Sequence, residues 1–201
     1  MPVTPSSAFE GFRFPPEIIV LALRWYLRRF TPLRADAAVP CPHLVGDRWY
    51  VDEANVKITG KWRDVYRAVD QYGQIIDVLV SARRDLRTGR RFFATALRAH
   101  GDPGRSRHGS GPALRAAIQG LIPAAFHNTA QYANNRVECD HGRLKARLRP
   151  MRGLNRDHSA RVIICGHALM QNNRRGHYEL GIDALTHRRI EAAFTEPAQT
   201  I

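Results

Sequence analysis

Two acidic residues of this sequence lie where their side chains could do chemistry. The first is Asp52, in the middle of residues 48–58, a run rich in apolar, β-favouring residues that ends before a turn at Gly60 and therefore predicts a strand. A buried carboxylate costs free energy unless a cation or a hydrogen-bond donor compensates it, and a bound divalent metal is one such cation. The alternative is an edge strand from which Asp52 simply faces water. The segment alone leaves both interpretations open.

The second acidic residue is Glu138, on a helix predicted over residues 134–149. Glu138, His141 and Lys145 are spaced by about one turn each, so one stripe of this helix carries an acid, a histidine and a base. Such a basic helix is either a solvated face that its dipole stabilises, or a site where Glu138 holds a metal while cations hold phosphates. Only the position of Glu138 relative to Asp52 decides between them. The cations in question are Lys145, Arg143, Arg147 and Arg149.

The composition favours a protein that binds polyanions. The chain has 201 residues, enough for one good-sized domain, and 31 Lys plus Arg against 18 Asp plus Glu give a net charge of +13. Such a field gathers nucleic acid first and anionic membrane second. No apolar run approaches the roughly 18 residues of a membrane span, and residues 1–10 do not resemble a signal peptide. The three cysteines, Cys41, Cys139 and Cys165, are far apart, which is typical of reduced thiols in a cytoplasmic protein.

The hydrophobic pattern predicts an α/β domain with a mixed sheet. The expected strands are an antiparallel meander over 48–58, 61–69 and 74–81 and a short strand within 124–128, and the expected helices cover 88–99, 112–121, 134–149 and 158–174. The basic, glycine-rich stretch 100–111 has no apolar residues and is expected to be a gap without a strand. We divide the chain into an N-terminal tail, helix and linker over 1–47, a core over 48–175 and a C-terminal tail over 176–201.

Several motifs of the sequence occur together in one known family. They are Tyr50-Val51-Asp52-Glu53, Gly60-Lys61-Trp62, Tyr66-Arg67-Ala68-Val69-Asp70, Asn134-Asn135-Arg136-Val137-Glu138-Cys139-Asp140-His141 and, near the start, Arg24-Trp25-Tyr26-Leu27-Arg28. With these motifs, residues 9 to about 180 resemble the DDE transposases of bacterial insertion sequences. The type they resemble is the cointegrate-forming one, the insertion sequence six family.

The resemblance implies an RNase H-like fold in which three carboxylates bind two Mg²⁺ ions. Asp52 matches the first acid and Glu138 the third, so we expect the two to lie close together, and Lys145 matches a basic residue that contacts DNA at the site. The implied chemistry is cleavage at transposon ends by water, followed by attack of the freed 3′ hydroxyl on target DNA. The implied partners are transposon-end DNA, target DNA and further copies of the chain, in the bacterial cytoplasm or on the nucleoid. Neither a membrane nor a small-molecule substrate is expected.

The chain departs from the family at the second carboxylate. That Asp should follow a short strand just before the helix that begins at Pro112, and the aligned position is Gly109. The preceding residues 105–108 lack the apolar side chains of a buried strand, and His108 would be a poor Mg²⁺ ligand. We therefore expect no strand transfer by this copy. We also expect Gly109→Asp alone not to restore it.

A second departure lies at the front of the chain. After Arg29 the sequence Phe30-Thr31-Pro32-Leu33 resembles the far side of the family's helix-turn-helix region, so we expect the recognition helix to be deleted and the helix before it to be a remnant. Two main hypotheses follow. The chain is a defective transposase that still binds DNA without sequence preference, or a non-catalytic DNA-binding or oligomerising remnant that interferes with an intact relative. A third is a product that does not fold stably.

Overall fold

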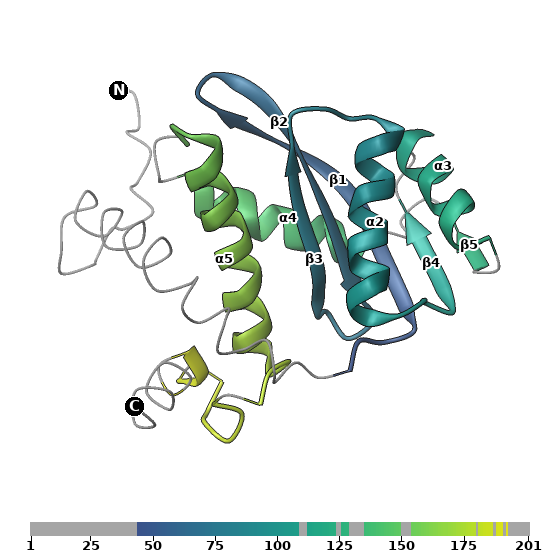
Figure 1. Ribbon diagram of the computed structural model, residues 1–201. Coiled ribbons are helices and arrows are strands. Elements are labelled where there is room, and N and C mark those ends of the chain that lie inside the picture. Colours follow the sequence, from purple (N-terminus) through teal and green to yellow (C-terminus); the bar gives the residue numbers. More distant parts are fainter. Residues whose placement is uncertain are drawn as a thin grey trace, which may run out of the picture.

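The fold is a five-stranded mixed sheet with helices on both faces (Figure 1). The computed structural model describes residues 44–108, 112–123, 126–128, 135–149, 154–179, 181–186, 188–190 and 192. The strands are β1 (Arg48–Ile58), β2 (Lys61–Asp70), β3 (Ile75–Ser81), β4 (Arg105–His108) and β5 (Phe126–Asn128). The helices are α2 (Leu86–His100), α3 (Pro112–Leu121), α4 (Asn135–Leu148) and α5 (Asp157–Arg175).

The sheet has the order β3-β2-β1-β4-β5. β1, β2 and β3 form the predicted antiparallel meander, and the first turn places Thr59 and Gly60 at positive φ. β4 pairs in parallel with the first four residues of β1, and β5 pairs in parallel with β4. β1 is therefore an interior strand as far as Val51, so the alternative interpretation of it as an edge strand is wrong for this part, and Asp52 directly follows it.

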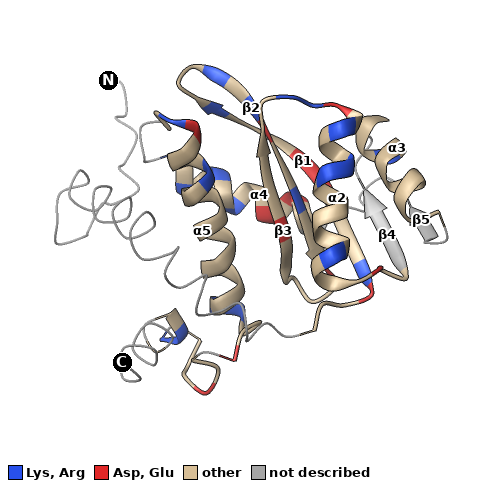
Figure 2. Ribbon diagram, in the orientation of Figure 1, with Lys and Arg blue, Asp and Glu red and all other residues tan. Residues whose placement is uncertain are grey.

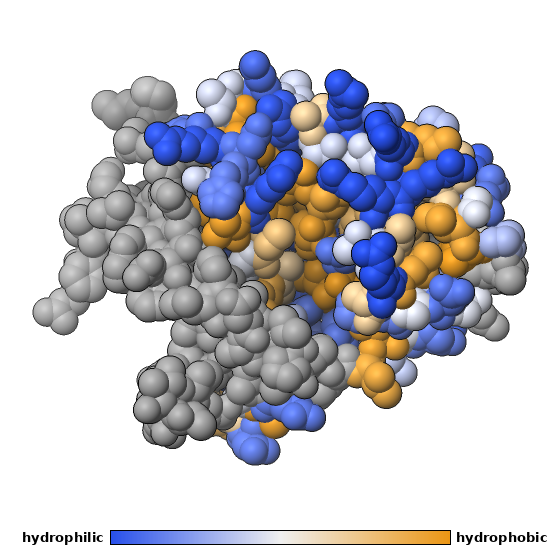
Figure 3. Space-filling model, viewed as in Figure 1, coloured by the Kyte–Doolittle hydropathy of each residue, from blue (hydrophilic) through white to orange (hydrophobic). Residues whose placement is uncertain are grey.

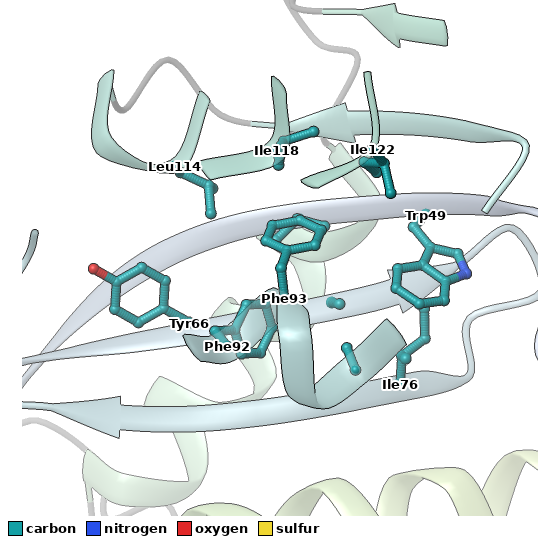
Figure 4. Packing of buried hydrophobic residues seen from close by; sticks show 11 residues of the cluster. Trp49, Tyr66, Ile76, Phe92, Phe93, Leu114, Ile118 and Ile122 are labelled. Atoms are coloured by element: carbon teal, nitrogen blue, oxygen red, sulfur yellow. The ribbon is translucent and has the colours of Figure 1, made fainter. Parts of the chain in front are cut away.

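One face of the sheet packs against α2 and α3. The core there is aromatic, with Tyr66 and Phe92 rings 5.9 Å apart and the Phe92 and Phe93 rings edge to face at 5.6 Å. Figure 4 shows Phe93 between the sheet and the apolar side chains of α3. The buried members of this cluster include Trp49, Val51, Tyr66, Ala68, Ile76, Phe92, Phe93, Ala96, Leu114, Ile118 and Ile122.

The other face of the sheet packs against α4 and α5. Because side chains alternate along a strand, β1 sends Tyr50, Val56 and Ile58 to this face and Trp49 and Val51 to the first one. Leu144 of α4 and Ile164 of α5 are buried against the sheet. Asp52 lies between Tyr50 and Val56 in this alternation, so its side chain belongs to the α4 face.

The strand β4 corrects the expectation of a gap over residues 100–111. Residues 105–108 form a strand although their side chains are polar, because β4 pairs through its backbone with β1 on one side and β5 on the other. Side-chain pattern does not reveal a strand that depends on backbone pairing with two neighbours. Gly109, which comes next in the sequence, lies outside the described residues.

The helix boundaries depend on local caps. α2 begins at Leu86, two residues before the predicted start, because the Asp85 carboxylate accepts a hydrogen bond of 2.8 Å from the Thr88 backbone N–H. α5 ends at Arg175, where Gly176 adopts the left-handed conformation. The predicted N-terminal helix remnant lies outside the described residues, as do Cys41 and nearly all of the segment 1–47. Cys139 and Cys165 are free thiols, and none of the described helices is long and apolar enough to cross a membrane.

Candidate active site

Asp52 lies on β1 just past the point where β4 ends. The last β4 residue, His108, pairs with Val51, and the cross-strand partner of Asp52 on β2 is Arg67. The Asp52 side chain is 23% exposed. Its backbone is thus fixed by the sheet while its carboxylate stays accessible from the α4 face.

Glu138 lies in the first turn of α4, and its charge acts on Asp52. Burial raises the pKa of Asp52 most, and the negative charge of Glu138 raises it further. The Glu53 backbone N–H and the positive charges of Arg84 and Lys145 lower it, but the net pKa remains above its usual value. The structure therefore brings Asp52, Glu138 and Lys145 within electrostatic reach of one another. In Figure 2 acidic segments of β1 and α4 lie near each other at the centre of the molecule.

His141 is the buried member of the α4 stripe. Its Nδ1 lies 3.9 Å from the Asp52 carboxylate, and its Nε2 is buried with no hydrogen-bond partner in the part of the chain that the structure describes. Burial, together with the charge of Arg67, lowers the pKa of His141 to about 4. At neutral pH the imidazole is therefore uncharged, and its contact with Asp52 is not an ion pair.

The four cations predicted to bind DNA do not share one side of α4. At about 100° per residue, Lys145 lies nearly in line with Glu138, whereas Arg143 and Arg147 lie roughly 140–180° around the helix. Arg147 faces away from Asp52, and its charge is among those that, after burial, lower the pKa of His167 in α5. Arg149 is exposed just beyond the end of α4. Of the four, Lys145 is thus the one whose charge reaches Asp52.

A buried ion network holds α4 against the sheet. Asp140 pairs with Arg67 of β2 and also, at 2.7 Å, with Arg175 at the end of α5, which donates in turn to the Gly73 carbonyl. Burial raises the pKa of Asp140, but the two guanidinium groups outweigh burial and hold the pKa below its usual range. Because Asp140 is two residues from Glu138 and Arg67 lies opposite Asp52, this network links the elements that carry both candidate ligands.

Glu53 is a buried acid to which the sequence analysis assigned no role. It points to the α2 face, opposite Asp52, and its side chain is only 1% exposed. Arg84, in the connection between β3 and α2, forms an ion pair with Glu53 and also lowers the pKa of Asp52. No periodic signal in the sequence indicates this pair, because it joins a strand to a connecting loop.

The donor set at Asp52 and Glu138 fits Mg²⁺ in chemistry but is incomplete. Both side chains offer the oxygen ligands that Mg²⁺ prefers, and a bound cation would offset the burial and the Glu138 charge that together raise the pKa of Asp52. Among the described residues no three His, Cys, Asp or Glu side chains are grouped to hold a metal ion. Gly109, which the resemblance aligns with the second carboxylate, has no side-chain ligand.

Sequence comparison identifies the relatives of this domain. A family model, DDE_Tnp_IS240, described as a DDE domain, matches residues 46–177. The transposase for insertion sequence-like element IS431mec of Staphylococcus aureus is 31% identical over 134 residues, covering 64% of this chain and 60% of that protein. The transposase of element IS257 in transposon Tn4003, also from Staphylococcus aureus, matches with the same identity and coverage. The chain thus spans less than two thirds of the length of these relatives.

Structural comparison supports the same fold. The HTLV-2 integrase catalytic core domain in complex with magnesium matches with a TM-score of 0.51 at 18% identity, covering 75% of this chain and 99% of that one. A chain of the simian T-cell lymphotropic virus intasome in complex with PP2A regulatory subunit B56 gamma also matches with a TM-score of 0.51, at 20% identity, covering 77% and 58%. The sheet, the helices on its two faces and residues 46–177 together place this chain in the DDE-domain family of insertion-sequence transposases, with an integrase-like RNase H fold.

Proposed function

We propose that this chain is a transposase by descent whose core, residues 48–175, binds DNA without sequence preference and does not catalyse strand transfer. The observation that carries the proposal is the packing of α4 against β1, which puts His141 Nδ1 3.9 Å from the Asp52 carboxylate and the charges of Glu138 and Lys145 within reach of it. Two acids and a base that meet from distant parts of the chain, inside a DDE domain, are the groups a phosphoryl-transfer site needs.

Asp52 and Glu138 would hold divalent metal in this proposal. Bound Mg²⁺ stabilises the entering and leaving oxygens of an in-line phosphoryl displacement. The protein's own part is to fix Asp52 by β-sheet pairing, to hold Glu138 by the Asp140 network and to aim Lys145 at a phosphate. A neutral His141 beside Asp52 adds no competing positive charge.

The excess of positive charge supports the DNA-binding part of the proposal. The chain carries +13 overall, and basic residues occur on the β1–β2 hairpin, α2 and α5 (Figure 2). Contacts of lysine and arginine with phosphates position a protein on DNA but do not read its sequence. We propose DNA, including transposon ends and target, and other copies of the chain as the partners, in the bacterial cytoplasm or on the nucleoid.

Gly109 supports the catalytic defect. Two metal ions would need several carboxylates to hold them, and a site that lacks one of these ligands would bind metal more weakly and position the attacking oxygen less well, which costs orders of magnitude in rate. The same observation favours the alternative function, a non-catalytic DNA-binding remnant that interferes with an intact relative. The two differ in whether any metal-dependent strand transfer remains.

A binding experiment tests the first part. The full chain is titrated with labelled random-sequence duplexes and with duplexes carrying the ends of a related element, at two salt concentrations. We expect salt-dependent affinity that differs little between the DNAs, and a larger loss for Lys145→Ala than for Arg98→Ala, a control that removes an exposed charge from α2. No binding at low salt, or a large preference for one sequence, would contradict the proposal.

A strand-transfer assay tests the second part. The full chain is incubated with Mg²⁺ and DNA carrying the ends of a related element, and joined products are counted. We expect none. Joining that Asp52→Ala abolishes would show that this copy is active and that a ligand other than residue 109 completes the site.

A further inference from the structure

The end of the β1–β2 hairpin extends beyond the neighbouring strands. β4 pairs with β1 only as far as Val51, and β3 pairs with β2 only from Asp64 onward. We call residues 55–63 the hairpin arm. One face of the arm is covered, because Val56 and Ile58 pack with Leu154 and the Thr59 backbone N–H donates to the Leu154 carbonyl. Figure 1 shows the arm projecting past the end of β3.

The other face of the arm carries an exposed tryptophan beside a lysine. Trp62 is 65% exposed and its cross-strand partner is Lys57, whereas the exposed Lys61 pairs with Ile58 and so points to the opposite face. The Lys57 ammonium lies 5.9 Å from the centre of the indole ring. Figure 3 shows hydrophilic side chains gathered along the edge formed by the arm and the first turns of α2 and α5. An exposed indole with an ammonium group beside it offers both a face for stacking and a charge for a phosphate.

We propose that Trp62 is a stacking platform for an unpaired DNA base, with Lys57 holding an adjacent phosphate. Aromatic rings with nearby cations are how proteins bind nucleic acid strands whose bases are accessible, because every base has a face on which to stack. The inference rests on the proposed function, DNA binding by this core, and adds the group that would contact a base.

The aromatic pair lies at a distance from Asp52 and on the opposite face of β1. Lys57 follows Asp52 by five residues, and at about 3.3 Å per residue the arm's aromatic pair lies roughly 17 Å along β1 from the carboxylate. That is about half a turn of B-form DNA. Because five residues separate Asp52 from Lys57, their side chains point to opposite faces of β1, so a nucleic acid strand that contacts both passes around the edge of β1 that β4 leaves uncovered beyond Val51.

Binding of three DNAs separates stacking from phosphate contact. The probes are a duplex, the same duplex with a single-stranded tail, and the tail alone, each titrated into the full chain at several salt concentrations. We expect Trp62→Ala to lower affinity for the two DNAs with unpaired bases roughly 5- to 150-fold, with little change for the duplex and an unchanged salt slope. Lys57→Ala should instead reduce the salt slope by about one. Trp62→Phe, which keeps an aromatic ring, should retain most of the affinity.

Tyr72→Ala is the matched control. Tyr72 is 70% exposed at the turn between β2 and β3, at the other end of β2, so its loss should leave all three affinities unchanged. Tryptophan fluorescence gives a second readout, in proteins where Trp25 is replaced by Phe. DNA should then quench the exposed Trp62 but not Trp49, which is 1% exposed, and the quenching should disappear in Trp62→Phe.

The outcomes distinguish the inference from the function on which it rests. If no protein binds any DNA, the proposed function fails and the inference fails with it. If all bind and Trp62→Ala matches the unmodified chain, stacking is wrong while DNA binding stands. Equal losses on duplex and tailed DNA, or a changed oligomeric state with unchanged DNA affinity, would also overturn it. Circular dichroism melts of Trp62→Ala and Trp62→Phe exclude misfolding as the cause.

Discussion

Arg67 and Asp140 form a completely buried ion pair, with side chains 0% and 1% exposed. Arg67 is also the cross-strand partner of Asp52, and Asp140 lies two residues beyond Glu138 on α4. The pair therefore determines how the helix that carries one candidate metal ligand sits on the strands that carry the other. The Nε and Nη2 atoms of Arg67 have no partner among the described residues, so its charge depends on Asp140.

Asp140→Asn should destabilise the protein by about 3–5 kcal/mol, because it leaves a guanidinium buried without its counterion. The matched control is Asp157→Asn, which breaks the surface ion pair with Arg63 and should cost much less. Urea denaturation followed by circular dichroism measures both. Equal costs for the two variants would mean that the buried network does not hold α4.

His167 should make stability fall as the pH drops below about 6.5. Burial first, and then the charge of Arg67, lowers its folded pKa to about 3, so between these pH values the unfolded chain binds the proton more tightly. The contribution is fully present above pH 6.5 and declines by about 1.4 kcal/mol per pH unit toward pH 3. Urea denaturation at several pH values should show a shallower decline for His167→Asn. An unchanged slope would place the titrating group elsewhere.

Metal should stabilise the chain weakly, and a third carboxylate should strengthen the effect. Ligands that bind only the folded state raise its stability, so Mg²⁺ or Mn²⁺ should raise the melting temperature, and Asp52→Asn should abolish the rise. Gly109→Asp should increase it, because β4 brings the chain alongside β1 as far as the Val51–His108 pair, next to Asp52. Isothermal titration with Mn²⁺ gives the affinities. No gain in Gly109→Asp would mean that position 109 does not contribute to the site.

Two glycines in helices should respond in opposite ways to alanine. A Cβ on Gly142 of α4 meets no atom within 4 Å, so Gly142→Ala should stabilise by about 0.5–1 kcal/mol through helix propensity. A Cβ on Gly89 of α2 would lie 3.1 Å from the Ala117 Cβ of α3, and both positions are buried. Gly89→Ala should therefore destabilise, since it pushes two packed helices apart. Thermal melts compare them, and stabilisation by both would refute close packing of α2 on α3.

Residues 48–81 could be predicted from the sequence because their structure is local. Alternating apolar residues and turn residues determine the meander, and the observed ends of its strands differ from the predicted ones by at most one residue. The α4 stripe likewise follows from helical spacing, which correctly put His141 and Lys145 on the side of Glu138.

The polar strand and the buried ions could not be predicted in this way. Residues 105–108 form β4 through backbone bonds to strands far away in the sequence, which their own side chains do not indicate. One reason for expecting that Gly109→Asp alone does not restore strand transfer was the lack of a strand before it, and β4 removes that reason. The other reason, the expected loss of the end-recognition region, concerns residues outside the described ones. Charged residues such as Arg67 and Glu53 look like surface groups in a sequence, because burial by pairing is a property of the whole fold.

The large separation in sequence between the meander and the helices that pack on it also has a consequence for folding. Hairpins close small loops and form quickly, whereas contacts such as Arg67 with Asp140, 73 residues apart, and Ile75 with Asn172, 97 residues apart, must close long ones. The meander with Asp52 can therefore form before Glu138 has any fixed position beside it. The carboxylate pair then arises only in the last stage of folding, and a shortened chain that ends before α4 would keep the strand of Asp52 without ever assembling the site.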